Sequence, residues 1–237
     1  MALPLYLAMT AAEIAACDAF PQPMGWMACH FSPYGTGLSN CPASLPREAM
    51  LIVNDRTPIA GHDGTLIAEQ LASLVEKLEA DSVLLDFQRE NCPETATAAK
   101  IIIDALPCPT AISAVYAAGL NCPVLLPPPP PDTPLADHLG KWDGRELWLE
   151  AALTAAEITV TAEGSIYREL SSVHTEGGFC HQALCCHYRA EEAENALRFT
   201  LWRTPEDLAA LLKEAEGLGV TRAVGLYQEL AGHHPPV

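Results

Sequence analysis

Eight short apolar runs, each bounded by turn-forming residues, constrain the fold of this chain more than any other feature. The runs are nearly continuous rather than alternating, which is typical of parallel strands covered on both faces. We expect strands at residues 3–9, 25–31, 49–54, 82–87, 111–116, 123–126, 145–151 and 221–227. Eight strands are the number that closes a (β/α)₈ barrel, a fold of about 250 residues. The 237 residues present therefore predict one such domain over 1–237.

Amphipathic helices separate several of these strands. Apolar residues recur at helical spacing over 64–80, 94–106 and 205–217. Asp63 precedes the first helix as an N-cap, and Thr204 followed by proline opens the third. Strands alternating with helices are typical of βαβ units in a parallel sheet. Elsewhere the helical patterns are short or missing, so we expect an irregular α/β barrel of the TIM type.

Residues 157–203 interrupt this alternation. Two pairs of short β-type runs, each pair joined by turn residues, predict two hairpins there. We therefore expect an antiparallel β insertion between the seventh and eighth barrel strands. Earlier in the chain, the prolines at 127–131 end the sixth strand, because proline donates no ladder hydrogen bond. We interpret this run as a stiff rim loop; a docking site for a proline-recognising partner is the alternative.

Composition limits the location and the partners of the chain. Of the residues, 49% are apolar and 18% are charged, and this composition favours a well-packed core over disorder. A net charge of −17 disfavours nucleic acids and anionic membranes, so neither is expected as a partner. The apolar N-terminus lacks the positive region of a signal peptide. Nine cysteines in no regular framework favour a reducing, cytoplasmic location.

The C-terminal strand ends are where a barrel of this type places its functional side chains. Asp86 ends the fourth strand and Glu150 the seventh, so the two carboxylates are predicted to face each other as the catalytic acid and base of a hydrolase. An inward-pointing Asp86 would be buried, which raises a carboxyl pKa; the alternative is that it fixes a neighbouring loop. The other strand ends supply residues expected to bind a substrate, namely Gln88, Asp55, His30, Tyr116, Tyr227 and Glu229.

The segment Asp81-Ser-Val-Leu-Leu-Asp86-Phe-Gln88 resembles the fourth-strand motif D-x-x-D-x-D-x-E of glycoside hydrolase family 18. This resemblance implies a (β/α)₈ barrel with an insertion between strands seven and eight. It also implies that the last motif residue protonates the glycosidic oxygen. Here Leu84 replaces the middle aspartate and Gln88 replaces that glutamate, and an amide cannot donate the proton. The resemblance implies a carbohydrate or other polar small molecule at the barrel mouth, bound by a divergent or catalytically degenerate protein.

Two other functions remain open from the residues alone. One is a non-catalytic interaction protein that uses the proline run and the insertion as docking surfaces. The other is a metal-assisted hydrolase using Asp55, Asp86, Glu150 and a histidine. The cysteines and histidines of segment 180–187 match no standard zinc spacing, and the common nucleotide and hydrolase motifs are absent, so no metal and no cofactor is expected. The sequence leaves substrate identity and oligomeric state open.

Overall fold

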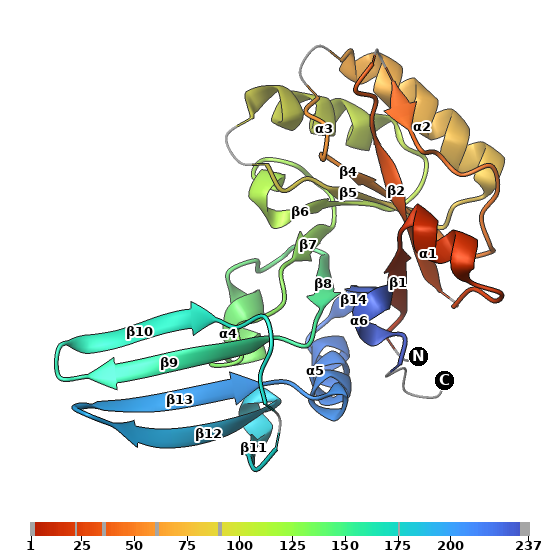
Figure 1. Cartoon of the computed structure of the whole chain (residues 1–237). Helices are drawn as coiled ribbons and strands as arrows, with labels where there is room; N and C mark the ends of the chain where they lie inside the picture. The colour runs from red at the N-terminus through yellow and green to blue at the C-terminus, as the bar shows by residue number, and fades with distance from the viewer. Residues whose placement is uncertain are drawn as a thin grey trace.

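Eight parallel strands form a closed barrel in the computed structural model, which describes residues 3–21, 23–34, 37–59, 62–89, 92–174 and 176–232 (Figure 1). The strands follow the order β1-β14-β8-β7-β6-β5-β4-β2, and pairing of β1 with β2 closes the ring. They are β1 (Leu5–Met9), β2 (Met24–Phe31), β4 (Met50–Asn54), β5 (Ser82–Asp86), β6 (Thr110–Ser113), β7 (Val124–Leu126), β8 (Leu147–Ala151) and β14 (Val220–Leu226). Each of the eight predicted runs forms one of these strands, so the predicted barrel is confirmed.

Two predicted strands end earlier than their apolar runs. The run 111–116 leaves the sheet after Ser113, because Ala114–Tyr116 form the 3₁₀ turn η1. The run 221–227 ends at Leu226, and Tyr227–Leu230 form the short helix α6. A further short strand, β3 (Leu38–Ser39), pairs antiparallel with the last two residues of β2, beyond the part of β2 that pairs with β1.

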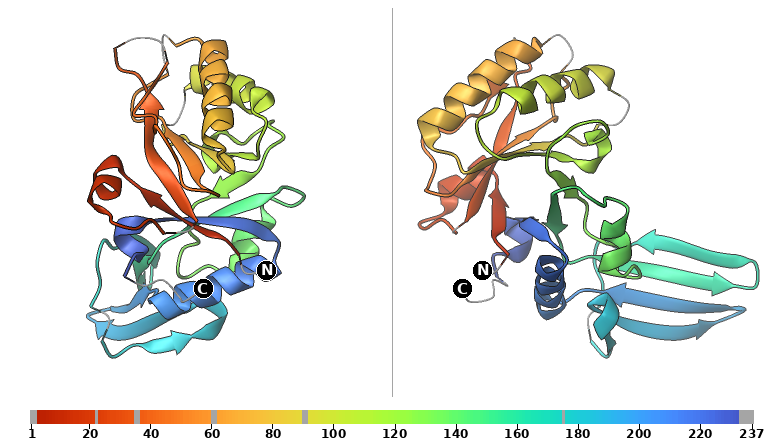
Figure 2. Two further views of the ribbon diagram at one scale, coloured as in Figure 1. Left: turned by 90° about the vertical axis from the view of Figure 1, so that its right-hand side faces the viewer. Right: turned by 180° about the vertical axis from the view of Figure 1, so that it is seen from behind.

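The helices cover the barrel unevenly, as the sequence predicts. The three long helices are α2 (Gly64–Leu78), α3 (Pro93–Ala105) and α5 (Pro205–Gly217). Asp63 caps α2 by accepting from the backbone N–H of Thr65, and Thr204 caps α5 in the same way. Figure 2 shows α2 and α3 side by side and α5 on another side of the barrel. The other described helices, α1 (Ala11–Ala16), α4 (Leu135–Gly140) and α6, have fewer than two turns, which makes the barrel irregular.

Alternation along the strands produces two separate cores. In β5, Leu84 faces the barrel interior and Leu85 faces the surrounding helices. The interior is filled rather than open; its buried side chains are Tyr6, Ala8, Met50, Ile52, Leu84, Ala111, Leu125, Trp148 and Val224. Because large side chains fill the middle of the barrel, a ligand can enter only at an end.

The N-terminal end of the barrel is closed by a polar cluster. Arg222 forms an ion pair with Asp81 at 3.1 Å, and its guanidinium lies 4.8 Å from the ring centre of Trp148. The hydroxyl of Tyr6 donates to the same Asp81 carboxylate at 2.7 Å. Asp81, the first residue of the fourth-strand motif, therefore stabilises the end opposite the mouth.

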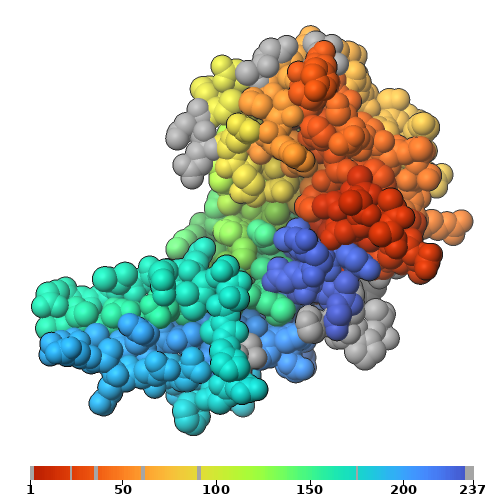
Figure 3. Space-filling view, viewed as in Figure 1, coloured from red at the N-terminus to blue at the C-terminus, as the bar shows by residue number. Residues whose placement is uncertain are grey.

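The predicted insertion is an antiparallel sheet of five strands in the order β10-β9-β13-β12-β11. Its strands are β9 (Ala155–Thr161), β10 (Gly164–Glu169), β11 (Phe179–His181), β12 (Cys186–Ala193) and β13 (Ala196–Trp202), and the turn η2 (Gln182–Leu184) follows β11. Both predicted hairpins are present, whereas β11 was not expected. This sheet, called the flap below, spans residues 155–202 and projects from the barrel between β8 and α5 (Figures 1 and 3). In the described part of the chain, no helix has the length and apolar character to cross a bilayer.

The proline run is a fixed loop between β7 and α4 at the base of the flap. The buried guanidinium of Arg203 donates to the carbonyls of Pro129 at 2.5 Å and Pro130 at 3.3 Å. His138 contacts the carbonyl of Pro127 through Nε2 at 2.9 Å. Since proline carbonyls have no ladder partner here, these side chains supply the hydrogen bonds that a sheet would otherwise give.

Candidate functional site

Three polar residues lie side by side where neighbouring strands reach the mouth of the barrel. The register aligns His30 of β2 with Asn54 of β4, and Asn54 with Asp86 of β5. Ile52 and Leu84, two residues before Asn54 and Asp86, belong to the interior core. Because side chains alternate, Asn54 and Asp86 point into the barrel at its C-terminal end.

Asp86 is half-buried and is held by two hydrogen bonds to the same oxygen. The amide Nε2 of Gln88 donates to Oδ1 at 2.6 Å, and the hydroxyl of Ser113 donates to it at 3.2 Å. No hydrogen bond from another described residue reaches Oδ2. The carboxylate is therefore fixed in orientation and retains one oxygen that can accept from a ligand.

Glu150 on β8 lies within electrostatic reach of Asp86. Burial raises the pKa of Glu150 to about 7, and the negative charges of Asp86 and Glu229 add to the effect. Glu150 thus retains its proton to a higher pH than an exposed glutamate does. The structure places a potential proton donor and an oriented carboxylate at the same mouth.

A small hollow lies between these side chains. It has a volume of about 60 Å³, with Asp86, Gln88 and Glu150 as its polar members. Its apolar lining comes from Ala8, Met27, Ile52, Leu84, Leu125, Val224, Gly225 and Leu226. A water needs about 10–15 Å³ by this measure, so the hollow holds a few waters or one polar substituent of a larger molecule.

Asp55, the residue that follows β4, is buried and faces the loop after β5. Its two carboxylate oxygens accept from the backbone N–H groups of Gln88 at 3.1 Å and Arg89 at 2.8 Å. Arg89 in turn donates from Nε to the carbonyl of Asp55 at 2.8 Å. Asp55 therefore fixes the backbone that carries Gln88, and it lines no part of the hollow.

The other predicted site residues lie outside the hollow. Tyr116 packs edge-on against Phe87 in the outer core and donates its hydroxyl to the carbonyl of Arg89. The hydroxyl of Tyr227 lies 3.7 Å from Sγ of Cys17. Nδ1 of His30 lies 3.1 Å from the carbonyl oxygen of Ala28.

Glu229 on α6 accepts from the backbone N–H of Leu153, which lies in the connection between β8 and the flap. Of the predicted residues, the structure brings together Asp86, Gln88 and Glu150, with the charge of Glu229 close to Glu150.

Ser113 is a hydrogen-bonding partner of Asp86 that the sequence interpretation did not include. It ends β6, beside Asp86. The apolar run predicts a strand that continues to residue 116, which makes Tyr116, and not Ser113, the expected strand end. The polar Ser113 within this apolar run was the signal in the sequence. A buried polar side chain needs a hydrogen-bonding partner, so it often stands at the end of a strand.

The histidines and cysteines of segment 180–187 do not converge. Cys180 pairs with His187 and His181 with Cys186, so alternation places these two pairs on opposite faces of the flap. Nδ1 of His187 is engaged with the Asp207 carboxylate at 2.7 Å. Across the described ranges, no three side chains of His, Cys, Asp or Glu are arranged to hold a metal ion.

The fold is similar to that of glycoside hydrolase family 18 enzymes. The class V chitinase from Nicotiana tobaccum, solved as a Glu→Gln mutant in complex with NAG4, gives a TM-score of 0.60 at 10% identity, covering 99% of this chain and 95% of that chain. A family 18 N-acetylglucosaminidase from Paenibacillus barengoltzii gives 0.60 at 8% identity, covering 98% and 97%. The Bacillus cereus spore cortex-lytic enzyme SleL gives 0.56 at 11% identity, covering 94% and 70%. No family model and no curated protein sequence matches the chain. The predicted resemblance to family 18 is thus confirmed as a likeness of fold.

Proposed function

We propose that the barrel mouth binds a saccharide, and that the chain is a divergent glycoside-hydrolase-like protein without the usual proton donor of family 18. The observation that carries this proposal is the grouping of Asp86, Gln88 and Glu150 around one hollow at the C-terminal ends of the strands. In barrels of this type, that end is where ligands bind.

The hydrogen-bonding groups at the mouth suit a sugar. Oδ2 of Asp86 accepts from a hydroxyl, the amide of Gln88 both donates and accepts, and Glu150 donates when protonated. A hollow of about 60 Å³ is too small for a whole ring but accommodates one substituent. We therefore place the ring across the rim, with one polar substituent inserted between Asp86 and Glu150.

Gln88 favours binding over rapid hydrolysis. Its amide has no proton to transfer at any physiological pH. Glu150, with a pKa raised to about 7 by burial, is the remaining group able to protonate a leaving oxygen. Any hydrolysis by this chain would accordingly depend on Glu150 as acid and on Asp86 as its partner carboxylate.

The likeness of fold indicates which saccharides to try first. Structural neighbours include a chitinase in complex with NAG4 and an N-acetylglucosaminidase. Oligomers of N-acetylglucosamine are therefore the first probes. A cytoplasmic location, expected from the cysteine content, would favour a short saccharide over a polymer.

A thermal-shift screen of the purified chain tests the proposal. The panel comprises N-acetylglucosamine oligomers, other oligosaccharides, sugar phosphates and divalent metal ions. A saccharide at a hundred times its dissociation constant adds about 2.7 kcal/mol to the free energy of unfolding, or a rise of roughly 5–11 °C in Tm.

Two variants locate the binding in this screen. Asp86→Asn removes the acceptor charge with little change of shape and is expected to abolish the rise. Asp104→Asn alters an exposed aspartate on α3 and is expected to leave it intact. A folded protein whose Tm no saccharide changes would contradict the proposed function, and a rise with metal ions alone would favour the metal-assisted alternative.

A further inference from the structure

The two faces of the flap differ sharply in character. The register places Phe199 opposite Ile158, and Leu197 opposite Val160, so these four side chains share a face. The large apolar and aromatic side chains on this face, which is called the apolar face below, are Ile158, Val160, Tyr167, Phe179, Tyr188, Leu197, Phe199 and Leu201.

The opposite face carries the charges of the flap. There Glu157 forms ion pairs with Arg168 at 3.0 Å and with Arg198 at 3.5 Å. Arg189 and Glu191 form another pair at 3.0 Å. This face is suited to water, whereas a sheet with one apolar face normally packs that face on a core.

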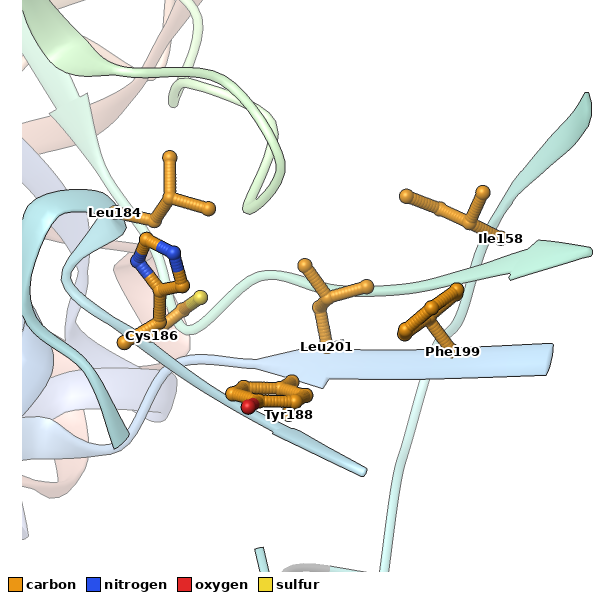
Figure 4. A pocket seen from close by; sticks show the side chains of 7 residues that line it. Ile158, Leu184, Cys186, Tyr188, Phe199 and Leu201 are labelled. Atoms are coloured by element: carbon orange, nitrogen blue, oxygen red, sulfur yellow. The ribbon is translucent and has the colours of Figure 1, made fainter. Parts of the chain in front are cut away.

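The apolar face is uncovered along much of its length. Phe179 is 67% exposed, Tyr167 41%, Val160 39% and Leu197 37%. Figure 4 shows part of this face around a hollow of about 220 Å³, lined by Ile158, His181, Leu184, Cys186, Tyr188, Phe199 and Leu201. An apolar cavity of about 150 Å³ accepts benzene, so this hollow is large enough for an aromatic or branched aliphatic side chain.

The total exposed surface is larger than a monomer of this mass should have. A folded monomer of 25.4 kDa is expected to expose about 10,300 Å². The chain exposes 12566 Å², which is about 2,200 Å² more than that expectation. Stable homodimers bury roughly 1,000–2,500 Å² of each partner. The excess therefore matches one side of such an interface, and Figure 3 shows the flap standing away from the barrel.

Charge and chemistry favour a second copy of this chain as the occupant. At a net charge of −17, two copies repel each other over most of their surface, so they can associate only through an uncharged patch. The apolar face is largely uncharged, because the register places only two acidic side chains on it, Glu169 on the edge strand β10 and Glu192 on β12. A saccharide would find few hydrogen-bonding partners among Ile158, Val160 and Leu197.

We propose that two copies of the chain form a symmetric dimer by packing the apolar faces of their flaps together. The two sheets would stack face to face at about 10 Å, each supplying side chains to the hollow of the other. A two-fold arrangement uses the same patch on both copies, so it closes without leaving the patch exposed. This assembly is independent of the saccharide site, because it uses no residue of the barrel mouth.

Sedimentation equilibrium of the purified full chain tests the proposal, with Phe179→Glu and Ile166→Glu as a matched pair. Both side chains are 67% exposed, but Ile166 pairs with Thr159 and lies on the charged face. From about 1 to 100 μM, which spans micromolar dissociation constants, we expect twice 25.4 kDa for the unaltered chain and for Ile166→Glu. For Phe179→Glu we expect the monomer mass and a dissociation constant raised at least about 100-fold.

A second variant shows whether loss of the dimer comes from the apolar face as a whole or only from a local change in the edge strand β11, which carries Phe179. Leu197→Glu alters the central strand β13 on the apolar face and is also expected to yield monomers. Circular dichroism of each variant establishes that it is folded. An unaltered chain that stays monomeric at about 100 μM would overturn the proposal, as would a folded Phe179→Glu or Leu197→Glu variant that remains dimeric.

Discussion

Replacing Glu150 by glutamine should stabilise the protein, and only above mildly acidic pH. The ordinary carboxyl pKa of 4.5 applies in the unfolded chain, whereas burial raises the pKa of Glu150 in the folded chain to about 7. Between these values the unfolded chain releases a proton that the folded chain retains. The free energy of unfolding therefore falls as the pH rises from about 4.5 to about 7, and it levels off above that range.

The size of this effect follows from the two pKa values. At ~1.4 kcal/mol for each pKa unit, the difference corresponds to about 3 kcal/mol. Glutamine has nearly the same shape and never ionises, so Glu150→Gln should avoid the loss. We expect equal stability of the two proteins near pH 4.5, and an advantage for the variant of about 3 kcal/mol at pH 8, or roughly 6–12 °C in Tm.

Urea and thermal unfolding at several pH values from about 4.5 to 8 measure this difference. Glu69→Gln on α2 is the control, because its exposed carboxylate is hydrated in the folded and the unfolded chain alike. Asp86→Asn removes the stronger of the two negative charges that act on Glu150, so it should move the transition in the Glu150 curve to lower pH. A stability difference between Glu150→Gln and the unaltered chain that stays constant with pH would refute the burial of this carboxyl.

Two further predictions concern the thiols and the missing acid. The Sγ atoms of Cys29 and Cys41 lie 3.6 Å apart, so the oxidant diamide should link these two first among the nine cysteines; peptide mapping by mass spectrometry checks this, and random pairing would argue against the loop geometry. Gln88→Glu places a carboxyl, which can carry a transferable proton, within hydrogen-bonding distance of Asp86. We expect hydrolysis of a chromogenic N-acetylglucosamine oligomer above the level of the unaltered chain, and an unchanged rate in a variant that still binds saccharide would show that residue 88 is not positioned as an acid.

The barrel was predictable because burial on both faces leaves a direct record in the sequence. Strands such as Met50–Asn54 are apolar at every position except the last, and the polar end residue marks the mouth. The long helices were equally clear, since Thr204 and Asp63 are cap residues at their starts. Hydropathy, however, does not show which backbone groups are hydrogen-bonded. The apolar residues of the turn after Ser113 therefore resemble a continuing strand.

Side-chain partners were the part that sequence could not supply. Asp86 ends β5 and Asp55 directly follows β4, yet Asp55 turns to the backbone of Gln88 and Arg89 while Asp86 lines the hollow at the mouth. Asp81 and Asp86 belong to one motif, but about 3.3 Å of rise for each residue puts them at opposite ends of the barrel. The sequence indicated the hairpins of the flap but not its exposed apolar face, because that exposure depends on how the sheet projects from the barrel.

Titration calorimetry of N-acetylglucosamine oligomers into the purified chain tests the saccharide site most directly. We expect saturable heat at one site per chain, lost in Asp86→Asn and retained in Asp104→Asn. We also expect binding to depend on pH around 7, where Glu150 changes charge. A folded chain that gives no heat with any of these oligomers, or equal binding by the unaltered chain and Asp86→Asn, would contradict the assignment of the barrel mouth as a saccharide site.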